Sequence, residues 1–110
     1  MKVLVVDDFA AMRETVEEYL KGLGVEVIVC GSGEKAVPYL DKVGVLITDL
    51  EMPGGMGGDE LARVAKGKNP DMPVLIMTGR VGLVPKDHLA DAVFEKPFQL
   101  HALGSWLGLT

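Results

Sequence analysis

The chain has 110 residues, of which 48% are hydrophobic and 25% charged, and a formal net charge of −5. This length fits a single domain, over residues 1–110, that buries a core of its own. The negative charge and the absence of a basic cluster argue against nucleic acid and anionic membranes as direct partners. Cys30 is the only cysteine, and no apolar stretch is long enough to span a bilayer, so we expect a cytoplasmic domain.

Five apolar runs of strand length alternate with segments of helical period, which is typical of an α/β fold with a parallel sheet. Most of these runs lack polar/apolar alternation, as expected when helices cover both faces of a sheet. The second run partly alternates and fits an edge strand. The predicted strands are Lys2–Val6, Val25–Cys30, Gly44–Thr48, Pro73–Met77 and Ala92–Glu95.

Helical periodicity is clearest between the first two strands, from Met12 to Leu23. Two further helices have apolar faces at three- and four-residue spacing, one around Leu61 and one around Leu103. Two helices are predicted to be short. Pro38 removes a backbone donor from the second, and the fourth has room for about two turns, at 85–90.

This order of elements resembles the doubly wound, flavodoxin-like sheet with strand order 2-1-3-4-5, here with short second and fourth helices. Ligands of such sheets bind beyond the carboxyl ends of the strands, where the strand order reverses. The first and third strands flank that point. They end in Asp7 and Asp8, and in Asp49.

Five polar side chains follow four of the strands: Asp7, Asp8, Asp49, Thr78 and Lys96. A carboxylate at the end of a buried strand is costly unless a cation meets it there. Three carboxylates, a hydroxyl and an ammonium at one edge of a sheet can hold a divalent cation and a phosphoryl group.

These residues lie in motifs that resemble the receiver domain of two-component response regulators, and the match covers essentially the whole chain. The motifs are Val5-Val6-Asp7-Asp8, Asp49-Leu50-Glu51-Met52-Pro53-Gly54, Thr78-Gly79 and Lys96-Pro97-Phe98. The start of the chain is most similar to single-domain chemotaxis-type regulators. A receiver module of a larger protein, such as a hybrid histidine kinase, also fits.

The resemblance implies that Asp49 accepts a phosphoryl group from a histidine kinase, a phosphotransfer protein or a small phosphodonor. It further implies a Mg²⁺ ion held by Asp8, Asp49 and the backbone carbonyl of Glu51, with Asp7 acting mainly through water. The domain would promote its own phosphorylation and dephosphorylation and would turn over no separate substrate. Phosphorylation would switch partner binding or pass the phosphate on.

Lys96 and Thr78 complete the implied site. The ammonium would pair with one phosphoryl oxygen, and the hydroxyl would bind another after moving inward. In the family the proline after the lysine, here Pro97, follows a cis peptide. Regulators of this family usually carry Tyr or Phe three residues before the lysine, whereas this chain has Val93, followed by Phe94.

Other positions bear on regulation and assembly. Glu51 and Arg80, each two residues beyond a site residue, are predicted to flank the phosphoryl path and to affect hydrolysis of the aspartyl phosphate. The charged residues that pair DNA-binding regulators are not evident, so a monomer is expected.

Taken singly, the site residues have simpler interpretations. Asp7 or Asp8 would cap the first helix, Asp49 would be a turn residue, Thr78 would cap a short helix, and Lys96 would be a solvated surface lysine.

Two other classes of protein use similar residues. A haloacid-dehalogenase-type phosphatase uses an Asp-x-Asp arrangement on its first strand and a cap region, whereas this chain has adjacent Asp7 and Asp8 and no cap. A pseudo-receiver binds partners without phosphorylation, but such domains have usually lost an acid, the threonine or the lysine. None of these is missing here.

Overall fold

The computed structural model describes all residues, 1–110, and has a five-stranded parallel sheet of order β2-β1-β3-β4-β5. The strands are β1 (Lys2–Val6), β2 (Glu26–Cys30), β3 (Val45–Asp49), β4 (Val74–Thr78) and β5 (Ala92–Glu95). The predicted fold class and strand order are confirmed. β2 begins one residue later than predicted, and β3 and β4 are each shifted by one residue toward the C-terminus at both ends. No helix is both long and apolar enough to cross a membrane.

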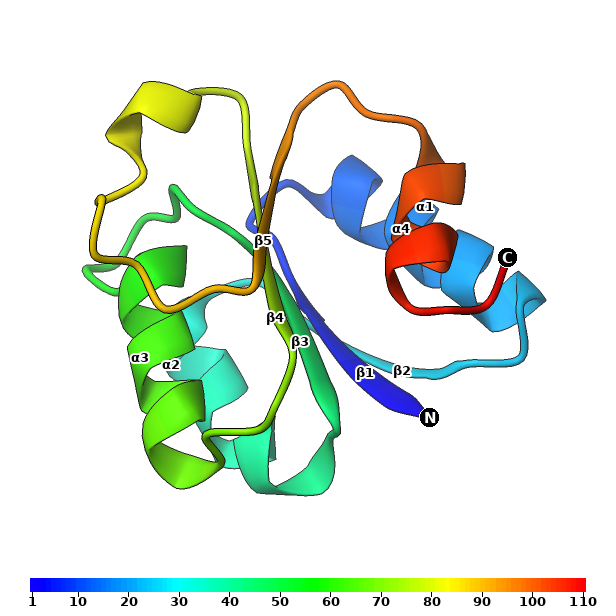
Figure 1. The fold of residues 1–110 in the computed structure, drawn as a ribbon, viewed down its shortest axis with the longest axis horizontal. Helices are drawn as coiled ribbons and strands as arrows, with labels where there is room; N and C mark the ends of the chain where they lie inside the picture. Colours follow the sequence, from blue (N-terminus) through cyan, green and yellow to red (C-terminus); the bar gives the residue numbers. More distant parts are fainter.

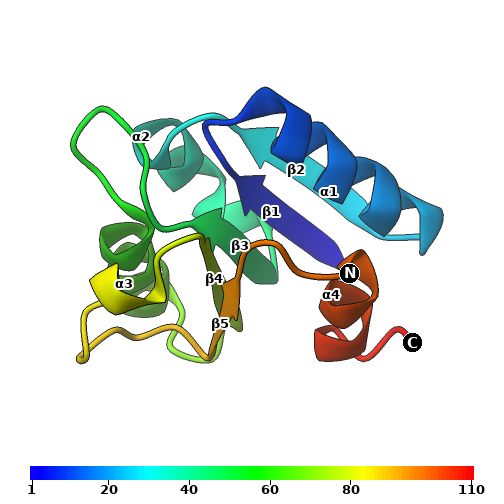
Figure 2. The ribbon, with the colours of Figure 1, turned by 90° about the horizontal axis from the view of Figure 1, so that it is seen from above.

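Helices cover both faces of the sheet. α1 (Ala10–Gly22) and α4 (Leu100–Trp106) lie on one face, and α2 (Gly33–Ala36) and α3 (Gly58–Lys68) lie on the other (Figure 1, Figure 2). Each face therefore has its own apolar core, and the central strands are buried on both sides. Neither β3 nor β4 has an exposed residue, which explains their unbroken apolar sequences.

The second helix is short, as Pro38 predicted. Ser32 caps α2, because its hydroxyl accepts a hydrogen bond from the Lys35 backbone N–H at 3.2 Å. After four α-helical residues the chain continues as a 3-10 helix, η1 (Val37–Lys42), with the proline in its first turn.

The short helix predicted at 85–90 is absent, and that prediction is wrong. A 3-10 turn, η2 (Val81–Leu83), is separated from β4 by two residues and is followed by Val84, whose backbone is extended. A residue before proline is disfavoured in the helical region, so Pro85 stops the turn. The segment beyond it is tied to β4 by Asp91, whose Oδ2 accepts a hydrogen bond from the Val74 N–H at 2.8 Å. Because Asp91 is held at the start of β4, few residues between Pro85 and Asp91 remain to form an α-helix.

Candidate functional site

Three carboxylates meet where the sheet order reverses. β1 and β3 are paired, with Val6 opposite Thr48, so the residues that end these strands come together. One carboxylate oxygen from each of Asp7, Asp8 and Asp49 lies within 4.8 Å of the others. Asp7 is fully buried, Asp49 is buried and Asp8 is exposed, so the cluster opens to solvent on one side.

Lys96 joins this cluster from β5. Its Nζ lies 3.1 Å from Asp7 Oδ2 and 3.2 Å from Asp49 Oδ1. The peptide between Lys96 and Pro97 is cis, as the resemblance implied. Burial alone would lower the pKa of Lys96, but the hydrogen bonds and charges of Asp7 and Asp49 outweigh it and raise the pKa above its usual value. The interpretation of Lys96 as a solvated surface lysine is therefore wrong.

The carboxyl group of Asp49 titrates abnormally. Burial raises its pKa to about 6, the charge of Asp7 adds to this effect, and Lys96 opposes it. Asp49 is therefore only partly ionised in mildly acidic solution, whereas a divalent cation in the cluster would favour the carboxylate.

The three carboxylates fit a hard divalent cation. They supply oxygen ligands, and the single ammonium of Lys96 leaves negative charge uncompensated among them. The exposure of Asp8 gives an ion a way in from solvent. The fourth ligand that the resemblance implied, the backbone carbonyl of Glu51, stays a prediction.

Thr78 ends β4 and is buried. Its hydroxyl oxygen accepts a hydrogen bond from the Arg80 backbone N–H at 2.9 Å. It is not a helix cap, because η2 begins after Arg80 without a side-chain cap. Asp7 and Asp8 do not cap α1 either: the residue at the cap position is Phe9, whose N–H donates to Asp7 Oδ1 at 3.0 Å.

An ion pair spans the loops beside the cluster. Arg80 donates two hydrogen bonds to the carboxylate of Glu51, from Nε at 3.0 Å and from Nη2 at 2.5 Å. The sequence placed both residues next to the site but did not predict that they pair. The sequence signal that could have predicted the pairing is that the two residues carry opposite charges and that each lies two residues beyond the end of a strand, the two strands being neighbours in the sheet.

An apolar depression of about 330 Å³, which no pattern in the sequence predicted, adjoins Lys96. Phe9 and Met12 from the start of α1 line one side, and Pro97 and Phe98 line the other. Phe9 is 65% exposed, which is unusual for so large an apolar side chain.

Val93 and Phe94 face opposite sides of β5, as their adjacency predicted. The ring of Phe94 packs edge-on against Phe98, with centroids 5.5 Å apart, and belongs to the core beneath α1 and α4. Phe94 therefore does not occupy the side of the strand on which Val93 lies.

The family model of the response regulator receiver domain matches residues 3–105. The chain belongs to this family. The resemblance found in the sequence is thereby confirmed, and with it the assignment of the domain to phosphorylation-dependent two-component signalling.

Several known proteins are similar to this receiver domain. A cyclic di-GMP phosphodiesterase of Thermotoga maritima is 37% identical over 94% of this chain and 29% of its own length. The autoinducer 1 sensor kinase/phosphatase LuxN of Vibrio harveyi is 35% identical over 96% of this chain and 13% of its own length. The receiver domain thus spans less than a third of either relative.

Among solved structures, the response regulator protein TrrA from Thermotoga maritima, in complex with Mg²⁺-BeF, superimposes with a TM-score of 0.88. It is 28% identical, and the alignment covers 99% of this chain and 98% of that one. The receiver domain of the hybrid histidine kinase CckA is 26% identical, with a TM-score of 0.81 over 98% of this chain and 96% of that one.

Proposed function

We propose that Asp49 is the phosphoacceptor of this receiver domain and that the donor is a phosphohistidine of a histidine kinase or phosphotransfer protein. The observation that carries this proposal is the position of the Lys96 ammonium, in contact with Asp7 and Asp49 at the point where the strand order reverses. That arrangement places a nucleophile and a cation for phosphoryl oxygens side by side.

In the transfer, an oxygen of Asp49 attacks phosphorus while the P–N bond to the partner's imidazole breaks. The electron pair of that bond stays on the imidazole nitrogen. Lys96 moves from pairing with the free carboxylate to pairing with a phosphoryl oxygen, and buried Asp7 keeps the ammonium in place. A Mg²⁺ ion would be held by Asp8, Asp49 and the Glu51 carbonyl, with Asp7 acting through water, and it would supply neutralising charge for the phosphoryl group.

Thr78 is the third proposed contact of the phosphoryl group. Its hydroxyl accepts from the Arg80 N–H, so its own hydrogen is free to donate. A phosphoryl oxygen on Asp49 is a strong acceptor for that hydrogen, and the bond would draw the β4 end of the loop toward the site. This movement would be the signal read by a downstream protein.

A separate phosphatase activity is disfavoured by the environment of the first strand. A haloacid-dehalogenase-type nucleophile there would be Asp7, but this side chain is fully buried and paired with Lys96. Turnover is therefore proposed to be confined to the domain's own aspartyl phosphate. We also propose a monomer in the cytoplasm that binds neither nucleic acid nor membranes, in keeping with the charge of −5.

The Asp49→Asn variant tests the proposed phosphoacceptor. Wild-type protein incubated with Mg²⁺ and acetyl phosphate or phosphoramidate should gain one phosphoryl group by intact mass, and the variant should gain none, because an amide is not a nucleophile for phosphorus. Asp87→Asn, which removes an exposed carboxylate outside the site, serves as the matched control and should label as the wild type does.

Labelling of the Asp49→Asn variant would assign the phosphate to another residue. A wild type that binds Mg²⁺ but labels with neither donor would point to the pseudo-receiver. The adduct should also require Mg²⁺ and be released by base, as an acyl phosphate is.

The apolar depression beside Lys96 supports a partner that docks next to the phosphoacceptor. A phosphohistidine must come within bonding distance of Asp49, so the protein that carries it would cover the surface around Phe9.

Phe9→Ala is expected to slow transfer from a phosphohistidine domain at least about tenfold, while labelling by acetyl phosphate stays within about twofold. Leu109→Ala, exposed on the last residues of the chain, is the control. Equal slowing with both donors would contradict docking at Phe9.

A further inference from the structure

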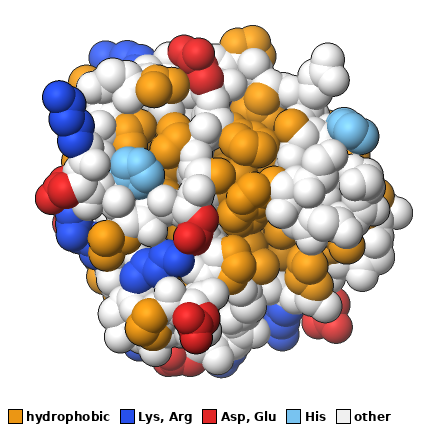
Figure 3. All heavy atoms as spheres, in the orientation of Figure 1, with side chains coloured by type: hydrophobic (Ala, Val, Ile, Leu, Met, Phe, Trp, Pro, Cys, Tyr) orange, Lys and Arg blue, Asp and Glu red, His pale blue; other side chains and the backbone are white.

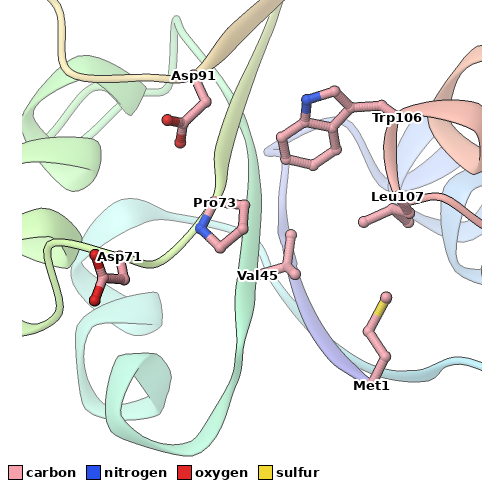
Figure 4. A pocket seen from close by; sticks show the side chains of 7 residues that line it. All are labelled: Met1, Val45, Asp71, Pro73, Asp91, Trp106 and Leu107. Carbon is pink, nitrogen blue, oxygen red and sulfur yellow. The ribbon is translucent and has the colours of Figure 1, made fainter.

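A second cavity lies at the opposite end of the sheet from Asp49. Its walls come from the amino ends of four strands, where Met1 precedes β1, Val45 begins β3, Pro73 precedes β4 and Asp91 precedes β5. Figure 4 shows these side chains together with Trp106 and Leu107, which approach from the end of α4. The proposed phosphoacceptor chemistry makes no use of this cavity.

The cavity exists because the last helix is short. α4 has only seven residues and ends at Trp106, and the chain then turns back at Gly108, whose φ is +77°. The helix therefore does not extend over the amino ends of β3 and β4. An open space of about 270 Å³ is left, and the half-buried indole of Trp106 forms one of its walls.

Apolar and acidic groups lie on different sides of this cavity. The indole and Leu107 lie on the α4 side, and the carboxylates of Asp71 and Asp91 lie across from them, beyond Val45 and Pro73 (Figure 4). The molecular surface shows a band of apolar side chains along the middle of the same face (Figure 3). No lysine, arginine or histidine lines the cavity.

The two carboxylates have unused capacity for a cation. Asp91 Oδ2 accepts hydrogen bonds from Lys66 Nζ and the Val74 N–H, both at 2.8 Å, but its other oxygen has no partner in the chain. Asp71 takes part in no ion pair of the chain. Lys66 neutralises Asp91, but Asp71 leaves net negative charge beside the aromatic face of the cavity, and both features attract cations.

We propose that this cavity binds a small organic cation, an ammonium or guanidinium group carried on a short apolar stem. The charged group would face Asp71 and Asp91, and the stem would pack on Trp106 and Leu107. The volume lies just below the usual range for ligand pockets, which suits a ligand of side-chain size and is too small for a nucleotide. A free amine or guanidine and a basic side chain of a partner protein share this chemistry.

Trp106 makes the proposal directly testable, because it is the only tryptophan of the chain and its fluorescence reports on this cavity. The full chain is titrated with butylguanidinium and, as the uncharged analogue of the same shape, with butylurea. The guanidinium should change the emission of Trp106 saturably, and butylurea should not. Raising the salt concentration should weaken the binding, because the carboxylates are partly exposed.

Asp71→Asn is the matched variant, since it removes one carboxylate without breaking an ion pair. It should weaken binding of butylguanidinium about fivefold. Asp41→Asn, an exposed acid that does not line the cavity, should leave binding unchanged. No saturable change, or an equal response to butylurea, or equal affinity in the Asp71→Asn variant, would overturn the proposal.

A short acetylated peptide with one arginine distinguishes the two sources of the cation. Tighter binding of the peptide than of butylguanidinium would indicate a protein partner. Tighter binding of butylguanidinium would indicate a free small molecule. Either outcome requires that the Asp71→Asn variant bind the better ligand more weakly than the wild type.

Discussion

Lys96→Met is expected to lower the free energy of unfolding by about 2–4 kcal/mol at pH 7 in metal-free buffer. Methionine keeps most of the stem of the lysine but removes the ammonium that contacts both Asp7 and Asp49. Asp7 is then a fully buried carboxylate without a cation, and breaking a buried pair in this way is strongly destabilising. This loss is smaller than that of a fully buried pair, because the Lys96 side chain is 23% exposed and water screens part of the interaction.

Urea denaturation with a metal chelator measures this loss, and Lys86→Met is the control. Lys86 is exposed and forms no ion pair, so its replacement should change stability by less than about 0.5 kcal/mol. Mg²⁺ should restore part of the stability of Lys96→Met, because an ion that binds only the folded state stabilises it. A Lys96→Met variant whose stability is the same with and without Mg²⁺ would contradict the proposed cation site.

The loss should also shrink as the pH is lowered from 7 to 5. Without Lys96, burial and the charge of Asp7 raise the folded-state pKa of Asp49 further above its unfolded value. The folded variant then binds more protons than the unfolded chain, so its stability rises as the pH falls. The wild type, in which Lys96 opposes the upward shift of Asp49, should gain less over the same range.

The positions of the site residues could be predicted from the sequence because the sheet is parallel. Carboxyl ends of parallel strands meet at one edge, so identifying the apolar runs was enough to bring Asp7, Asp49, Thr78 and Lys96 together. An error of one residue in a strand boundary did not matter, since each polar residue directly follows or ends its strand. Lys96 contacts both aspartates because all three residues lie at that edge of the sheet.

Contacts that depend on loop conformation could not be predicted in this way. The pairing of Glu51 with Arg80 requires the loops after β3 and β4 to bend toward each other. Hydrophobic periodicity indicates helices and strands but gives no information on the conformation of loops. The helix predicted at 85–90 failed for a related reason. Start and stop signals are local, whereas the chain there is held by Asp91 bonding back to the N–H that begins β4.

The loop between β3 and α3 also places the backbone of Asp49, the proposed phosphoacceptor, against a helix. α3 begins at Gly58, and its backbone N–H donates to Leu50 O at 2.8 Å. A Cβ atom at this position would lie 2.1 Å from the backbone oxygen of Asp49 and 3.0 Å from Leu50 Cα. Both neighbours are backbone atoms, so a side chain here cannot be accommodated by changing a rotamer.

Gly58→Ala is therefore expected to destabilise the domain by at least about 3 kcal/mol, or to displace α3 from the end of β3. Gly67→Ala is the matched control in the same helix, where nothing lies within 4 Å of an added Cβ. Alanine there should stabilise the domain by about 0.5–1 kcal/mol, because it restricts the unfolded chain and favours the helix.

Urea denaturation of the two variants should thus give changes of opposite sign for the same substitution. If Gly58→Ala folds, its amide chemical shifts should differ from the wild type most strongly around Asp49 and Leu50, and its labelling by acetyl phosphate should fall, because the nucleophile moves with its backbone. A Gly58→Ala variant with wild-type stability and labelling would show that α3 is free to shift away from β3. In that case the position of Asp49 would be maintained by Lys96 and the sheet alone.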